Sequence, residues 1–151
     1  MSSGDRLPLE VINDLRAALP ETKIHTFYGL TELGGRFCAL AAEKIATHAG
    51  SVGQPIEGMS VRIIDGRGES LPPETSGEIA ASGEYLFKDY ANDPQKTSLV
   101  FDGKELRTGD VGYLDKEGFL FVEGRNDDVF KVSGRKISAL VVQQALMDCG
   151  V

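Results

Sequence analysis

Across residues 51–124, turns that contain glycine recur at intervals of about eight to twelve residues, and apolar residues alternate with polar ones between them. Alternation with a period of two buries one face of a strand and exposes the other. The clearest hairpin pairs residues 111–114 with residues 119–122 across a turn at 115–118. The sequence therefore predicts a small antiparallel, barrel-like β-unit over residues 51–124.

Two further strands and one helix are expected inside this unit. Residues 60–64 show the alternation that is typical of strands, and residues 77–82 are also expected to form a strand. Asn92-Asp93-Pro94 is typical of a helix start, because Asp accepts hydrogen bonds from free backbone N–H groups and Pro suits the first turn. We expect this cap to begin a short helix that includes residues 95–98.

The first 50 residues have a different pattern. Residues 8–19 carry apolar residues at helical spacing, and Pro20 closes such a helix. The apolar face would consist of Val11 or Ile12, Leu15, Ala18 and Leu19. Residues 23–27 are then expected to form a strand, followed by a polar, glycine-rich loop at 28–35. Residues 1–50 are therefore interpreted as the end of an α/β unit, where ligands gather at the carboxyl ends of strands.

Residues 124–137 contain two arginines, two lysines, two aspartates and two glycines around a short apolar run. Two short strands are expected here, at 129–132 and 136–137, on either side of a Ser133-Gly134 turn. This charged segment joins the β-unit to an apolar helix predicted at 139–149, so it is interpreted as a hinge between two bodies. The fold class that these elements indicate is α+β.

The predicted helix at 139–149 is apolar along one side, and the sequence supplies nothing further to cover it. A hairpin and one helix cannot build a hydrophobic core by themselves. Two interpretations follow. The chain is a truncated piece of a larger protein, or the helix docks on the β-unit or on a partner, which would make a homo-oligomer plausible.

Charge and composition exclude several classes of partner. The formal net charge of −7 argues against nucleic acid and anionic membranes. No apolar run approaches the roughly 18 residues that span a bilayer, and the first residues do not resemble a signal peptide, so a cytoplasmic location is expected. Cys38 and Cys149 are expected to be reduced packing thiols. His25 and His48 have no metal-ligand spacing.

Three polar clusters could carry chemistry. Residues 28–32 combine an aromatic ring, a glycine, a hydroxyl and a carboxylate, a set that could stack a purine, bind a phosphate and hold Mg²⁺. In Arg107-Thr108-Gly109-Asp110, the carboxylate could accept two hydrogen bonds from a vicinal diol. Arg125 offers a planar fork for oxyanions or hydroxyls. The alternatives are a strand-terminating turn with an exposed Glu, an ordinary turn carboxylate and solvated surface charge.

The order of these clusters resembles the adenylate-forming enzyme superfamily, which includes acyl- and aryl-CoA synthetases, peptide synthetase adenylation domains and luciferases. Tyr28-Gly29-Leu30-Thr31-Glu32 is similar to its Tyr-Gly-x-Thr-Glu motif, and Thr108-Gly109-Asp110 to its Thr-Gly-Asp segment. Residues 124–137 are similar to its Gly-Arg-x-Asp-Asp hinge and the loop that follows. The segments 50–55, 77–79 and 92–94 also resemble family positions, so the resemblance covers essentially the whole chain.

The resemblance implies a two-step ligase. A carboxylate attacks the α-phosphorus of ATP to give an acyl-adenylate and pyrophosphate, and the thiol of coenzyme A or of a carrier-protein phosphopantetheine then displaces AMP. By the same resemblance, Tyr28 stacks on adenine and Gly29 borders the nucleotide and the acyl pocket. Thr31 contacts the α-phosphate, and Glu32 holds Mg²⁺, which offsets phosphate charge.

For the second half of the chain, the resemblance implies that Asp110 binds the ribose hydroxyls with Arg125 beside it. Asp127 is the expected hinge about which a small C-terminal lid domain rotates, and Gly134 is expected where the pantetheine arm passes. Residues 125–151 would then be the hinge and the truncated start of that lid.

The sequence departs from the family pattern in three ways. It contains no Gly, Ser, Thr-rich phosphate loop with its lysine and no C-terminal adenylation lysine, and Val141 stands where the family has an acidic residue. We therefore expect the chain to be catalytically incomplete by itself. The alternative is a non-catalytic module that binds AMP or another protein.

Overall fold

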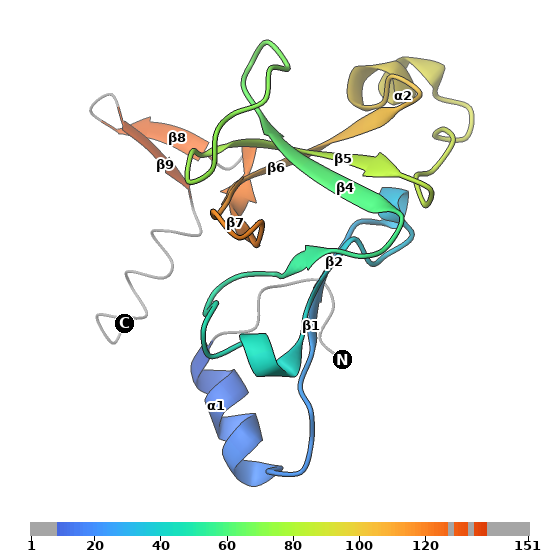
Figure 1. Cartoon of the computed structure of the whole chain (residues 1–151). Coiled ribbons are helices and arrows are strands. Elements are labelled where there is room, and N and C mark those ends of the chain that lie inside the picture. Colours follow the sequence, from blue (N-terminus) through green and yellow to red (C-terminus); the bar gives the residue numbers. More distant parts are fainter. Residues whose placement is uncertain (1–8, 127–128, 133–134, 139–151) are drawn as a thin grey trace.

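The computed structural model of the chain describes residues 9–126, 129–132 and 135–138 (Figure 1). Four predictions fall outside these residues: the hinge role of Asp127, the role of Gly134, the apolar helix at 139–149 with its proposed oligomer contact, and the state of Cys149. None of the helices among the described residues is long and apolar enough to cross a membrane.

Helix α1 (Leu9–Ala18) confirms the predicted N-terminal helix. Its burial differs from the prediction. Of residues 10–18, only Ile12 is buried, and it packs with Leu40, Ile45 and Phe119 in a small apolar cluster. Most of the expected apolar face remains open within the described part of the chain: Val11, Leu15 and Leu19 are 40%, 38% and 51% exposed. The helix therefore rests on the protein through one turn rather than along its whole length.

Three short strands form the first sheet, in the order β1-β2-β3. They are β1 (Thr26–Tyr28), β2 (Cys38–Leu40) and β3 (Gln54–Pro55), and both pairings are antiparallel. The strand predicted at 23–27 begins three residues later, because the ladder pairs Thr26 to Tyr28 with β2. Strands β2 and β3 were not predicted. Two 3₁₀ helices, η1 (Thr31–Leu33) and η2 (Ala42–Lys44), lie in the connections.

The second sheet has four antiparallel strands in the order β4-β5-β6-β7 (Figure 1). They are β4 (Met59–Ile64), β5 (Gly77–Gly83), β6 (Glu105–Leu114) and β7 (Leu120–Arg125), which confirms the strands expected near 60–64 and 77–82 and the predicted hairpin. Strand β6 begins six residues before the predicted 111–114, so Asp110 lies within a strand and not in a turn between strands. The barrel-like closure was wrong for the described residues. Strands β4 and β7 are the two edges of an open sheet, because no ladder joins them there.

Helix α2 (Pro94–Val100) lies between β5 and β6, as the cap residues predicted. The Asp93 carboxylate accepts a hydrogen bond of 2.9 Å from the backbone N–H of Lys96. Near the C-terminal end, β8 (Val129–Val132) and β9 (Arg135–Ser138) pair as an antiparallel hairpin, which confirms the two short strands expected after the charged segment.

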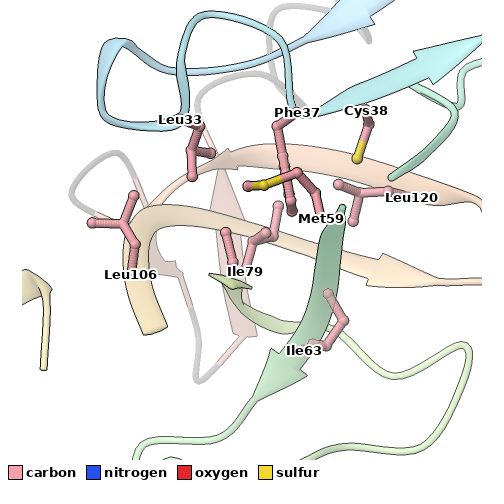
Figure 2. Close-up of a cluster of buried hydrophobic side chains, with 9 residues drawn as sticks. Leu33, Phe37, Cys38, Met59, Ile63, Ile79, Leu106 and Leu120 are labelled. Atoms are coloured by element: carbon pink, nitrogen blue, oxygen red, sulfur yellow. The ribbon is translucent and has the colours of Figure 1, made fainter. Parts of the chain in front are cut away.

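The main core joins the two sheets (Figure 2). It brings together buried side chains from the η1 loop, from β2 and from all four strands of the second sheet: Leu33, Phe37, Cys38, Met59, Ile63, Ile79, Ala81, Leu106 and Leu120. Backbone hydrogen bonds add to this contact, because Leu120 donates to the Gly53 carbonyl over 2.8 Å and Val52 donates to the Leu120 carbonyl over 2.9 Å. The core side chains Leu33 and Phe37 thus hold the loop after β1 against the four-stranded sheet, and the backbone bonds hold the segment just before β3.

Candidate functional site

The loop at residues 28–36 folds back tightly on itself. The Leu30 carbonyl accepts hydrogen bonds from the N–H groups of Leu33 (3.0 Å) and Gly35 (2.9 Å). A Cβ atom on Gly29 would lie 2.5 Å from the Gly35 carbonyl oxygen, closer than any side chain tolerates. Glycine is therefore required at position 29 for steric reasons, and the fold of this loop places Thr31 at the surface and leaves Glu32 half-buried.

Tyr28, at the end of β1, reaches the second sheet. Its hydroxyl donates a hydrogen bond of 2.5 Å to Oδ2 of Asp110, and its ring packs edge-on against Phe37 with centroids 6.1 Å apart. Burial raises the pKa of Tyr28 well above its usual value, and the nearby charge of Asp110 raises it further. The hydroxyl therefore keeps its proton and acts as a donor to the carboxylate.

Asp110 is positioned by a distorted stretch of β6. Its backbone N–H donates to Oγ1 of Thr108 (3.1 Å), and that hydroxyl donates to the Ile79 carbonyl on β5 (2.8 Å). The β5–β6 register shifts beside these residues. Gly109 adopts a φ of 74°, a conformation that favours glycine. Within Thr-Gly-Asp, the Thr108 hydroxyl accepts the hydrogen bond from the Asp110 backbone, Gly109 adopts the positive φ, and Asp110 supplies the carboxylate.

The surroundings of Asp110 shift the pKa of its carboxyl group in opposite directions. Burial raises the pKa of its carboxyl group, while the Tyr28 hydrogen bond and the charge of Arg125 lower it, and the balance is a raised pKa. Arg125 is the partner of Asp110 in the β6–β7 ladder, and one of its guanidinium nitrogens lies 3.5 Å from the Cβ position of Gly109. A carboxylate with one oxygen bound by Tyr28 and a neighbouring exposed guanidinium can accept hydrogen bonds from a polar ligand.

Glu32 is held by a different part of the chain. Its Oε1 accepts a hydrogen bond of 2.6 Å from the hydroxyl of Tyr90, and its backbone carbonyl accepts one of 2.8 Å from the N–H of Phe87. The hydrogen bond to Glu32, with a contribution from burial, raises the pKa of Tyr90 to about 12. Tyr90 is not among the residues that the motifs predicted. Its one sequence signal is that aromatic residues recur at Tyr85, Phe87 and Tyr90, just before the helix cap.

The structure thus brings some of the predicted site residues together and leaves others apart. Tyr28, Asp110 and Arg125 form one group, and Gly29 shapes the loop beside Tyr28. Glu32 makes its contacts with Phe87 and Tyr90 instead. Thr31 contributes its carbonyl to the turn, where it accepts from Gly34 over 3.2 Å, and its side chain faces solvent.

Within the described ranges, no group of three or more His, Cys, Asp and Glu side chains could hold a metal ion. His48 is buried and stacks on Phe119 with ring centroids 3.7 Å apart, which is a packing arrangement. Cys38 is a free, buried thiol whose pKa burial raises to about 12, as expected for a packing residue.

Comparisons with known proteins identify the family of the chain. The family model described as "AMP-binding enzyme" matches residues 1–91, and the chain belongs to this family. The resemblance that the motifs indicated is therefore confirmed. The chain is 32% identical to 4-coumarate–CoA ligase 2 of Nicotiana tabacum over 98% of its own length, and 33% identical to 4-coumarate–CoA ligase 1 of Glycine max over 97%. It spans 28% and 52% of the length of these two relatives.

A solved structure agrees in fold as well. The O-succinylbenzoate coenzyme A synthetase of Bacillus subtilis, in complex with ATP and magnesium ion, superposes with a TM-score of 0.89 at 30% sequence identity. The match covers 98% of this chain and 30% of that one. The described arrangement of sheets and helices is therefore that of part of an adenylate-forming enzyme.

Proposed function

We propose that this chain is part of an ATP-dependent ligase that activates a carboxylic acid as an acyl-adenylate and then transfers the acyl group to a thiol. One observation carries the proposal: the Tyr28–Asp110 hydrogen bond joins the two nucleotide motifs, which lie 82 residues apart in the sequence. The named activities of the relatives, which are CoA ligases, support the same reaction class.

In this proposal the nucleoside binds at the Tyr28–Asp110 group. The Tyr28 ring stacks on adenine, and Asp110 accepts hydrogen bonds from the ribose hydroxyls through the oxygen that Tyr28 leaves free. Arg125, the partner of Asp110 in the β6–β7 ladder, adds donors and positive charge beside it. Gly29 allows the loop to approach closely, and Thr31 at the surface of η1 contacts the α-phosphate.

The donor set around Glu32 fits Mg²⁺ shared with a nucleotide. Magnesium is usually held by one or two carboxylates together with substrate phosphates and water, so a single half-buried carboxylate is suitable and a cage of several ligands is not needed. When bound, Mg²⁺ offsets the phosphate charge that develops as the carboxylic acid attacks. Glu32 supplies the protein oxygen that places this ion.

The second half-reaction belongs to the C-terminal side. We assign the hinge to Asp127 and the passage of a pantetheine arm, from coenzyme A or from a carrier protein, to the backbone at Gly134. Rotation of a small domain about a few residues is a common way to reuse one site for two steps. The chain is proposed to be catalytically incomplete alone, because its sequence contains neither the phosphate loop nor the C-terminal lysine.

The direct test is calorimetry of AMP and ATP binding to the purified chain. We expect millimolar or tighter binding that Asp110→Ala abolishes, and no ATP–pyrophosphate exchange with carboxylic acids. Asp14→Ala, at an exposed position of α1, is a matched control that should bind normally. Binding that Asp110→Ala leaves intact would reject the assigned site. ATP–pyrophosphate exchange by the chain alone would contradict the proposal that it is catalytically incomplete. AMP binding by the intact protein without such exchange would favour a non-catalytic AMP-binding module.

A further inference from the structure

Glu32 is contacted at two points by one distant segment. The Phe87 N–H binds its backbone carbonyl, and the Tyr90 hydroxyl, 58 residues away in sequence, binds its carboxylate at 2.6 Å. The backbone contact alone attaches the segment to η1. The side-chain contact is a second, separate attachment, and it ends on the carboxylate itself.

Tyr90 is itself firmly placed. Its backbone N–H donates to Oγ1 of Thr97 (2.9 Å), and that hydroxyl donates to the Asp93 carbonyl (3.0 Å) at the start of α2. Its ring packs edge-on against Phe87 with centroids 4.9 Å apart, and the Lys96 ammonium lies 4.4 Å from the ring centre. Neighbouring residues hold both the backbone and the ring of Tyr90, so its hydroxyl has a fixed position beside Glu32.

The hydrogen bond leaves Glu32 able to bind a cation. An ionised carboxylate offers about four acceptor positions, and Tyr90 uses one of them, on Oε1. A neutral phenol orients the group without cancelling its charge, whereas an ammonium or guanidinium would compete with a metal ion for it. Partners that orient metal-binding carboxylates in this way are common in metalloenzymes.

We infer that Tyr90 is a positioning residue that holds the Glu32 carboxylate in place for the divalent cation bound with the nucleotide phosphates. The inference rests on the proposed function, because it takes Glu32 as the protein ligand of that cation. It adds a residue from the β5–α2 connection to a site otherwise built from the loop after β1 and from β6 and β7.

The test is Tyr90→Phe in the intact protein, which removes the hydroxyl and keeps the ring contacts with Phe87 and Lys96. Mn²⁺ serves as the probe, and its affinity is measured by electron paramagnetic resonance in the presence of ATP. We expect the Mn²⁺ affinity to fall about tenfold, the usual effect of losing a partner of a metal ligand. The affinity for AMP without metal should stay unchanged. Tyr85→Phe, at a tyrosine that is 52% exposed, is the matched control.

A second comparison separates positioning from general structural support. In a Glu32→Gln background, Tyr90→Phe should cause no further loss of Mn²⁺ affinity, because the hydroxyl acts through the carboxylate. Unchanged Mn²⁺ affinity in Tyr90→Phe, while the wild-type protein binds ATP with metal, would overturn the inference and leave the proposed function standing. If Tyr90→Phe lowers the metal-free AMP affinity as much as the Mn²⁺ affinity, Tyr90 has a general structural role, and the inference is also overturned. A wild-type protein that binds no nucleotide would overturn both the inference about Tyr90 and the proposed function.

Discussion

The Tyr28 hydroxyl donates a 2.5 Å hydrogen bond to Asp110, and this contact joins the end of β1 to the middle of β6. The two residues belong to different sheets, which share the core that contains Phe37 and Ile79. Burial of the pair keeps the phenol protonated and raises the pKa of the carboxyl group. The contact is therefore both a link between the sheets and a feature of the candidate site.

Removal of the Tyr28 hydroxyl should weaken nucleotide binding. Tyr28→Phe keeps the ring for stacking but leaves Asp110 without the donor that orients it. A hydrogen bond to a charged group contributes about 1.5–3 kcal/mol, so we expect AMP affinity to fall roughly tenfold or more. Calorimetry at neutral pH measures this, with Tyr85→Phe as the ring-matched control. An affinity equal to that of the wild type would show that the ring alone determines the contribution of Tyr28.

The raised pKa of Asp110 predicts a stability that depends on pH. The folded state binds this proton more tightly than the unfolded state, so stability is lost as pH rises from the unfolded pKa through the folded one. Asp110→Asn stays neutral and can still accept from Tyr28. We expect the variant to be more stable than the wild type at pH 7 by on the order of 1 kcal/mol. The difference in the free energy of unfolding between the two proteins should vanish near pH 3.

Urea unfolding from pH 3 to pH 8 checks this prediction. The same variant should bind AMP poorly, because the ribose site loses its charge. A wild-type protein that is more stable than Asp110→Asn at pH 7 would mean that the hydrogen bond from Tyr28 and the charge of Arg125 outweigh burial.

A side chain at position 29 should destabilise the loop. Gly29→Ala places a Cβ atom 2.5 Å from the Gly35 carbonyl oxygen, and both groups belong to a tightly bonded backbone. We expect a loss of about 1–3 kcal/mol in the free energy of unfolding, with weaker AMP binding. Gly66→Ala is the control, because nothing lies within 4 Å of its Cβ position. Equal thermal midpoints for the two variants would contradict the steric argument.

Loss of the cap on α2 should lower stability and loosen Tyr90. Asp93→Ala removes the acceptor of the Lys96 N–H, which costs about 1 kcal/mol at a helix N-terminus. Asp93→Asn retains an acceptor and should behave nearly as the wild type does. Thermal unfolding measures both variants. If the alanine and asparagine variants unfold at the same temperature, the side-chain cap does not stabilise α2.

Local sequence determined the elements whose pattern is long or whose termini are chemically marked. Strand β4 alternates over enough residues to identify its period, and the turn at 115–118 predicts the β6–β7 hairpin. Asp93 and Pro94 predicted the start of α2, because capping depends only on neighbouring backbone groups. The motifs at Tyr28, Thr108 and Gly124 were sufficient to indicate the family, which the family model confirms.

Tertiary structure alone decided which of these residues meet. Strands β1, β2 and β3 have only two or three residues each, too few for a periodic pattern, so their pairing depends on the packing of Phe37 and Cys38. The open sheet and the exposed side of α1 are likewise set by what the rest of the described chain covers. The Tyr28–Asp110 and Tyr90–Glu32 contacts span 82 and 58 residues. Such contacts depend on how elements far apart in the sequence pack together, which local sequence does not encode.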